Sequence, residues 1–221
     1  MKIVMLLLSF FSMFFPVMVN AENETSLAPK AKSAIMIEAT TGDIIFEKNA
    51  DEKLPPASMT KIMSMLLIIE SIEKGVIAWD EMVTVSENAS GMGGSQILLE
   101  TGEEMSVEDL FKGIAIASGN DAVVALAEKI AGTEEMFVDM MNEKAKKLGL
   151  TNTNFKNPHG LDEVNHYSTA RDMSTMAREL VKHKKVLEYT SIYETYLREN
   201  LDTKVWLVNT NKVVYKNYYS R

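Results

Sequence analysis

The chain has 221 residues, of which 46% are hydrophobic, and its 23 basic and 31 acidic residues give a formal net charge of −8. This composition is ordinary for a globular protein with a core, and it excludes a disordered chain, which would hold fewer apolar residues. A nucleic-acid-binding protein usually carries a basic excess, so we expect no nucleic-acid partner.

Residues 1–21 are interpreted as a secretory signal peptide. Lys2 precedes an apolar run from Ile3 to Val19, and the small residues around Ala21 are typical of a cleavage site. The alternative is an uncleaved membrane anchor, but the run is short for a spanning helix and Pro16 interrupts it. We therefore expect an exported, extracytoplasmic protein, held in the cell envelope or secreted.

The counts of cysteine and histidine restrict the chemistry. With no cysteine, the chain has no disulfides and no thiol nucleophile. His159, His166 and His183 are too few and too scattered for a metal site, and we interpret them as surface or loop residues. No Gly-x-Ser-x-Gly elbow supports a Ser-His-Asp triad. We expect neither a metal nor an organic cofactor.

The predicted fold opens with a β-hairpin. Residues 33–39 and 44–48 are short apolar-rich runs separated by Thr40-Thr41-Gly42-Asp43, which has the composition of a turn. A helix is expected from Ser58 onward, stopping at Gly75. Because this helix is apolar at nearly every position, we expect it to be buried.

Three further helices are predicted from periodicity, over residues 106–117, 121–131 and 133–148, and the sequence around Ser106 resembles a capping arrangement. Residues 91–95 are expected to form a flexible turn beside the cleft rather than a phosphate loop.

The last third of the chain is predicted as a loop over 152–167, a helix over 169–183 and a strand over 197–214, broken at 209–211. Trp79 and Trp206 are expected to be packing residues. The order of hairpin, helical body and returning strand is an α+β pattern.

The first candidate for catalysis is Ser58-Met59-Thr60-Lys61. Residues three apart at a helix start share one face, so the Ser58 hydroxyl and the Lys61 ammonium can meet. Burial among apolar neighbours favours a neutral lysine, which can take the proton of a serine nucleophile. The pattern Ser-x-x-Lys also fits Ser71-Ile72-Glu73-Lys74, but that copy lies in a charged last turn where Lys74 stays solvated. An N-cap serine followed by a surface lysine is the alternative for Ser58.

The second candidate is Ser118-Gly119-Asn120, at the junction of two helices. A loop serine can relay a proton, and an asparagine two positions on can hold a peptide carbonyl. Ser86-Glu87-Asn88 fits the same pattern, so the alternative is a simple helix-capping turn.

Taken in order, these segments resemble the exported serine-type D-alanyl-D-alanine carboxypeptidases, the low-molecular-mass penicillin-binding proteins. The likeness covers most of the mature chain and rests on four motifs: Glu38-Ala39-Thr40-Thr41-Gly42; Leu54-Pro55-Pro56-Ala57-Ser58-Met59-Thr60-Lys61; Ala117-Ser118-Gly119-Asn120-Asp121-Ala122; and Asn157-Pro158-His159-Gly160-Leu161-Asp162 with Tyr167-Ser168-Thr169-Ala170. It implies the penicillin-binding-protein/β-lactamase-like transpeptidase fold, a helical body plus an antiparallel sheet.

The resemblance also implies a reaction. Ser58 would attack the carbonyl between the two terminal D-alanines of a peptidoglycan stem peptide, and Lys61 would accept its proton. Ser118 would pass the proton to the leaving D-alanine, Asn120 would hold the substrate amide, and the Ser58 N–H would form half of an oxyanion hole. Penicillins and other β-lactams would acylate the same serine.

One family motif, Lys-Thr-Gly or Lys-Ser-Gly on a cleft strand, is absent from this chain. In the family it follows soon after a segment like Asn209-Thr210-Asn211-Lys212. We therefore expect residues 22–221 to be the N-terminal part of the catalytic domain, with an incomplete sheet. Membrane association is expected only through a C-terminal anchor, which this chain does not contain.

Two alternatives remain open at this point. A class A-like β-lactamase shares Ser-x-x-Lys but usually has Ser-Asp-Asn and a Glu-x-x-Leu-Asn loop, whereas position 119 is Gly here and that loop sequence does not occur. The other alternative is an inactive, truncated peptidoglycan-binding remnant that keeps Ser58 without turnover.

Overall fold

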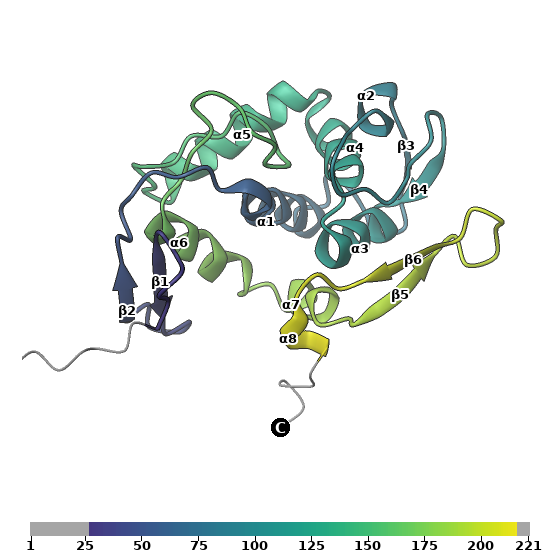
Figure 1. The fold of residues 1–221 in the computed structure, drawn as a ribbon. Coiled ribbons are helices and arrows are strands. Elements are labelled where there is room, and N and C mark those ends of the chain that lie inside the picture. Colours follow the sequence, from purple (N-terminus) through teal and green to yellow (C-terminus); the bar gives the residue numbers. More distant parts are fainter. Residues whose placement is uncertain (1–26, 216–221) are drawn as a thin grey trace, which may run out of the picture.

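The computed structural model describes residues 27–215, so the predicted signal peptide lies outside the described residues. Figure 1 shows a cluster of helices flanked by three small hairpins. The elements in chain order are β1 (Ala34–Ile37), β2 (Ile44–Lys48), the 3-10 turn η1 (Ala57–Thr60), α1 (Lys61–Glu73), β3 (Met82–Thr84), α2 (Glu87–Ser90), β4 (Glu104–Ser106), α3 (Val107–Ala117), α4 (Asn120–Ala131), α5 (Glu134–Lys147), α6 (Ala170–Leu180), α7 (Lys184–Thr190), β5 (Glu194–Leu197), β6 (Val205–Val208) and α8 (Lys212–Tyr215).

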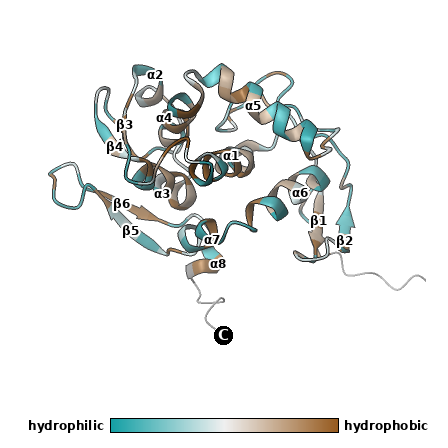
Figure 2. Cartoon of the chain, turned by 180° about the vertical axis from the view of Figure 1, so that it is seen from behind, coloured by the Kyte–Doolittle hydropathy of each residue, from teal (hydrophilic) through white to brown (hydrophobic). Residues whose placement is uncertain are grey.

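Helix α1 forms the centre of the molecule, as its apolar sequence predicts. Nine of its thirteen residues are buried, and α3, α4, α5 and α6 all pack against it. Figure 2 shows that α1 and the neighbouring α3 are largely apolar, whereas α5 is more polar. The helix is preceded by η1 and followed by Gly75, whose φ of +71° suits a residue without a side chain.

The predicted helices α3 to α6 are confirmed, and side-chain caps set the starts of α3, α5 and α6. The hydroxyls of Ser106, Thr133 and Thr169 each accept a hydrogen bond from the backbone N–H three residues later. Helix α6 ends at Leu180, three residues before the predicted boundary, and the chain then forms α7, which is too short to show a helical period.

The first hairpin is confirmed. Strands β1 and β2 pair antiparallel with Ala34 opposite Lys48, and a bulge lies between Met36 and Ile37. Strand β1 packs against α6. The hairpin of β3 and β4 is not predicted, because three-residue strands carry no readable alternation.

The predicted strand over 197–214 is wrong in extent. The structure places a hairpin of β5 and β6 there, with Tyr196 opposite Trp206, and turns the chain into α8 after Asn211. Trp79 packs against Phe111 as expected. Trp206 does not, because it is 57% exposed and its indole N–H donates to Glu194.

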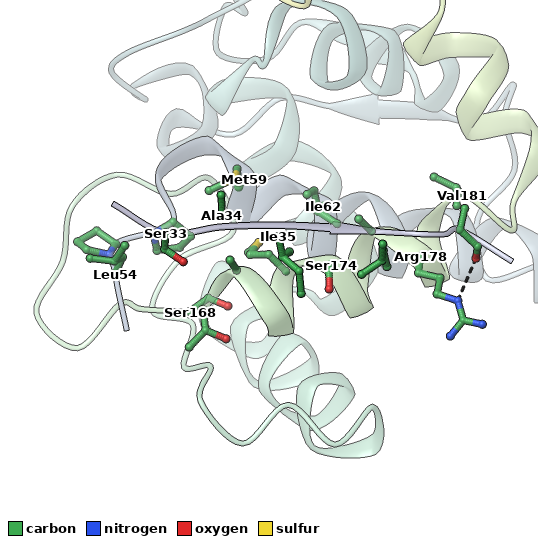
Figure 3. Close-up of a pocket in the computed structure, with 18 residues that line it drawn as sticks. Ser33, Ala34, Ile35, Leu54, Met59, Ile62, Ser168, Ser174, Arg178 and Val181 are labelled. Carbon is green, nitrogen blue, oxygen red and sulfur yellow. Dashed lines mark hydrogen bonds between the residues drawn. The ribbon is translucent and has the colours of Figure 1, made fainter. Parts of the chain in front are cut away.

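An apolar groove of about 530 Å³ lies between β1, the start of the helical body and α6. Figure 3 shows its lining, in which Ile35, Met59 and Ile62 contribute apolar side chains. Among the described strands β1 pairs only with β2, so its other edge is unpaired. The observed hairpins and helical body confirm the predicted α+β class. No helix within residues 27–215 has the length and apolar character needed to cross a bilayer.

Candidate active site

Ser58 and Lys61 meet at the start of α1, as their spacing predicts. Ser58 lies in η1 and is exposed, whereas Lys61 is the first residue of α1 and is only 2% exposed. Lys61 Nζ is 3.4 Å from Ser58 Oγ. An accessible hydroxyl is therefore paired with a buried amine.

Lys61 makes two hydrogen bonds that are shorter than its contact with Ser58. Its Nζ donates to Asn120 Oδ1 at 2.7 Å and to the backbone carbonyl of His159 at 2.8 Å. Burial disfavours the charged amine and lowers the pKa of Lys61 from 10.5 to about 8, although the carboxylate of Asp121 partly opposes this shift.

This geometry suits a neutral Lys61 amine that acts as a base. A neutral amine has two N–H groups and one lone pair, and an amide oxygen and a carbonyl oxygen accept the two N–H groups here. The lone pair is then left for the Ser58 hydroxyl proton. The arrangement can thus activate a serine for attack on a carbonyl.

Asn120 begins α4 and is held by the glycine-rich segment before it. Its backbone N–H donates to Ser95 O at 2.7 Å, and its Nδ2 donates to Gly93 O at 2.7 Å. Because Nδ2 is used in this way, Oδ1 faces Lys61. The segment 91–95 therefore lies beside the site, as predicted.

Ser118 is the one predicted site residue that the structure does not join to the others by a hydrogen bond. It caps α3 in a left-handed conformation, with φ +60°, and is half-buried. The described contacts include none from its hydroxyl to Ser58 or Lys61.

The loop 157–161 also contacts α1 through its backbone carbonyls, and the sequence does not predict these contacts. Besides the His159 carbonyl, Pro158 O accepts from Ser64 Oγ of α1 at 2.6 Å. Gly160 has φ +92°, and a Cβ there would lie 1.9 Å from Ala57 O. Only glycine allows the loop to approach η1 so closely.

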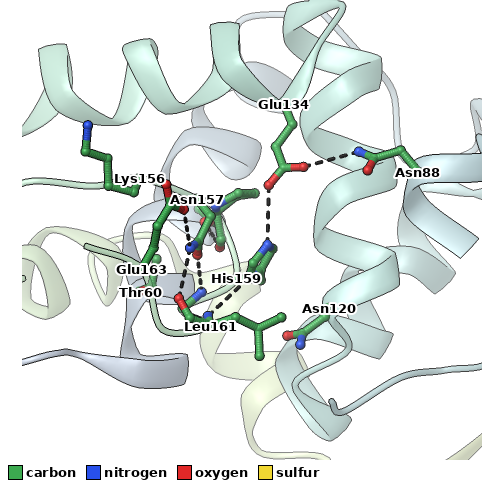
Figure 4. A network of polar contacts seen from close by, with 12 residues as sticks. Thr60, Asn88, Asn120, Glu134, Lys156, Asn157, His159, Leu161 and Glu163 are labelled. Atoms are coloured by element: carbon green, nitrogen blue, oxygen red, sulfur yellow. Dashed lines mark hydrogen bonds and ion pairs between the residues drawn. The ribbon is translucent and has the colours of Figure 1, made fainter. Parts of the chain in front are cut away.

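His159 and His166 lie in a loop, as expected, but they are buried and not at the surface. His159 Nδ1 accepts a hydrogen bond from the Leu161 N–H, and His159 Nε2 lies 3.3 Å from Glu134 Oε1 (Figure 4). The hydrogen bond from His159 lowers the pKa of Glu134. His166 Nε2 lies 2.8 Å from Thr60 Oγ1, and burial lowers the pKa of His166. Both rings brace the loop.

The other matches to the two short motifs form no site, as expected. Ser71 Oγ donates to Leu67 O within its own helix, and Lys74 is exposed and pairs with Glu70. Ser86 caps α2 by accepting from the Ala89 N–H. In the part of the chain that the structure describes, no group of three or more acidic, histidine or cysteine side chains is placed to hold a metal ion.

The structure thus places an exposed serine hydroxyl beside a buried lysine amine at the start of the central helix. Comparison with known families then shows that the chain belongs to the D-alanyl-D-alanine carboxypeptidase family, whose profile matches residues 18–220.

Curated relatives agree with this family. The chain is 57% identical over 195 residues to the D-alanyl-D-alanine carboxypeptidase DacF of Bacillus subtilis, covering 88% of this chain and 50% of the relative. It is 40% identical over 217 residues to DacC of Escherichia coli, covering 95% of this chain and 53% of that protein. The chain thus spans about half the length of these relatives.

Solved structures confirm the penicillin-binding-protein fold. The D-alanyl-D-alanine carboxypeptidase DacD from Francisella tularensis matches with a TM-score of 0.80 and 30% identity, over 87% of this chain and 58% of that one. Penicillin-binding protein 5 from Haemophilus influenzae matches with a TM-score of 0.79 and 33% identity, over 84% of this chain and 54% of that one.

Proposed function

We propose that the protein is a serine-type D-Ala-D-Ala carboxypeptidase, which removes the terminal D-alanine from peptidoglycan stem peptides. The observation that carries this proposal is the buried Lys61 amine, which contacts Ser58, Asn120 and the His159 carbonyl together. The names of the matched relatives point to the same activity.

In the proposed reaction, Ser58 Oγ attacks the carbonyl carbon of the penultimate D-alanine while its proton moves to Lys61 Nζ. The Ser58 N–H donates to the oxyanion, and Asn120 holds the substrate amide. The C–N bond then breaks, and Ser118 passes a proton to the departing D-alanine nitrogen. Water hydrolyses the acyl-enzyme, restores the Ser58 hydroxyl and releases the shortened peptide. The residues named here require no cofactor for these steps.

The same site would be acylated by β-lactams, because opening the lactam ring leaves the same kind of serine ester. Cleavage of peptidoglycan peptides belongs in the cell envelope, so we propose that residues 1–21 direct export. Two solved structures that match the chain, of penicillin-binding protein D2 from Listeria monocytogenes, are described as bound to ampicillin and to cefotaxime.

We further propose that residues 22–221 form the N-terminal part of the catalytic domain. The apolar groove and the unpaired edge of β1 support this, since they offer a place for more strands of the sheet. A Lys-Thr-Gly strand would be one such strand. The coverage of about half of each relative agrees with this division.

The test is release of D-alanine from a diacyl-Lys-D-Ala-D-Ala peptide by the purified protein. We expect release by a chain that continues through the Lys-Thr-Gly strand and by its Ser71→Ala variant, and none by its Ser58→Ala variant or by residues 22–221 alone. If the extended chain neither releases D-alanine nor reacts with penicillin, the proposal is wrong and the inactive remnant is the better description.

A further inference from the structure

The segment Ile97–Leu99, next to the site, is held from two sides by buried charges. On one side is Asp121 of α4, which is only 1% exposed. Its carboxylate accepts from the Ile97 N–H at 3.0 Å and from the Leu99 N–H at 3.1 Å. A buried carboxylate is stable when N–H groups surround it in this way.

On the other side is Arg198, which follows β5. Its guanidinium donates to Ile97 O at 3.1 Å and to Leu98 O at 3.1 Å, and it also pairs with Glu103. Its side chain is buried. Two N–H groups and two carbonyls of three consecutive residues are thus bonded to opposite charges from distant parts of the chain.

The backbone between these charges is strained. Leu98 has φ +59°, a left-handed conformation that costs free energy for a residue with a branched side chain, and that side chain is 64% exposed. Leu98 gains little burial in exchange, so the conformation is maintained by the bonds to Asp121 and Arg198.

The held segment continues directly from the residues that orient Asn120. Gly93 O and Ser95 O accept from the Asn120 side chain and main chain. A Cβ on Gly94 would lie 2.8 Å from Asn120 Nδ2, so the backbone at Gly94 and the side chain of Asn120 are in close contact. If Gly93 O moved, Nδ2 would lose its acceptor, and the amide could turn Oδ1 away from Lys61.

We propose that Arg198 and Asp121 are positioning residues: by clamping Ile97–Leu99 they fix the carbonyls of Gly93 and Ser95, and so aim the Asn120 amide oxygen at Lys61. The catalytic consequence rests on the proposed function. The clamp itself does not, because it is a property of the folded chain.

The test measures solvent exchange of the Asn120 side-chain amide protons by NMR, with their signal identified by its loss in Asn120→Asp. In Arg198→Ala we expect these protons, and the Ile97 and Leu99 amides, to exchange about tenfold faster or more. Arg171→Ala is the matched control, because the Arg171 guanidinium also pairs with two carboxylates, those of Asp51 and Glu47, and these residues are not part of the clamp. It should leave the three sites unchanged.

Two outcomes would overturn the proposal. Unchanged exchange at Ile97 and Leu99 in Arg198→Ala would show that there is no clamp. Faster exchange there with an unchanged Asn120 side chain would show that the clamp does not position the amide. If Arg198→Ala does not fold, Arg198→Lys replaces it, since a lysine keeps the charge but cannot reach both carbonyls and Glu103 together, and the same results are expected.

Acylation by a fluorescent penicillin separates this proposal from the proposed function. We expect slower acylation of Arg198→Ala than of Arg171→Ala. If the unaltered protein is not acylated at all, the proposed function fails, while the NMR exchange still decides whether the clamp positions Asn120.

Discussion

Lys61 is buried with two acceptors around its amine, so in the proposed reaction its protonation state decides whether Ser58 has a base. With a pKa of about 8, roughly one tenth of Lys61 is neutral at pH 7, and this is roughly 300-fold more than at its usual pKa of 10.5. Burial thus creates the base that the spacing of the two residues only permits.

We therefore predict that the rate of acylation by penicillin rises with pH through a midpoint near 8. The sign follows because the protonated amine has no lone pair, and the neutral fraction grows as pH increases through the pKa of Lys61. Acylation rates measured at a series of pH values from 6 to 10, with the reaction quenched at set times, give the midpoint.

Lys61→Arg is the control for this profile. Arginine stays protonated, so acylation should fall by orders of magnitude at every pH while the circular dichroism spectrum is unchanged. Lys74→Arg, in the unreactive copy of the motif, should behave like the unaltered protein. A flat profile between pH 7 and 9, or rapid acylation of Lys61→Arg, would mean that another group is the base.

At the residue scale, the sequence could pair Ser58 with Lys61 because their spacing is local, whereas Asn120, 59 residues from Lys61, is connected to them only by the order of the motifs. It could not place the His159 carbonyl or the carbonyls of Gly93 and Ser95. A backbone acceptor looks the same in every residue, and only the fold shows which one faces an amine.

At the scale of elements, the close contact between the loop 157–161 and η1 depends on Gly160. We predict that Gly160→Ala destabilises the protein by more than about 2 kcal/mol, because its Cβ would overlap Ala57 O at 1.9 Å in addition to the strain of φ +92°. Chemical denaturation with a two-state fit measures the free energy of unfolding.

Gly132→Ala is the matched control for this prediction. Gly132 has φ +88° but nothing within 4 Å of its added Cβ, so only the conformational strain remains, at about 1 kcal/mol. Equal losses in the two variants would show that the loop yields and that close approach to η1 is not required.

Long or capped elements were predictable, whereas short ones were not. Helix α1 shows its burial in its apolar composition, α3, α5 and α6 have readable periods and caps, and α4 has a readable period. The strands β3 and β4 are three residues each, and the predicted strand over 197–214 contains β6 but only the last residue of β5, Leu197. Pairing between distant segments decides such elements.

For the whole molecule, the α+β class followed from the order of elements, but the grouping of strands into three hairpins did not. The groove between β1 and α6 has a testable property. We predict that it binds a hydrophobic dye, because its lining is apolar and open. Ile35→Lys places a charge in the groove and should reduce the dye fluorescence several-fold.

Met36→Lys is the control for the groove, since Met36 neighbours Ile35 on the same strand but does not line the groove. It should leave the fluorescence nearly unchanged. Equal effects of the two substitutions would show that the dye binds elsewhere. The proposal that further strands pack in this groove would then lose one of its supporting observations.

The central claim is that Ser58, activated by Lys61, is an acylated nucleophile. The most direct measurement is to react the protein with a fluorescent penicillin, digest it, and find the labelled peptide by mass spectrometry. We expect one label, on Ser58, which persists in Ser71→Ala and disappears in Ser58→Ala. A label on any other residue, or one that survives in Ser58→Ala, would contradict the central claim.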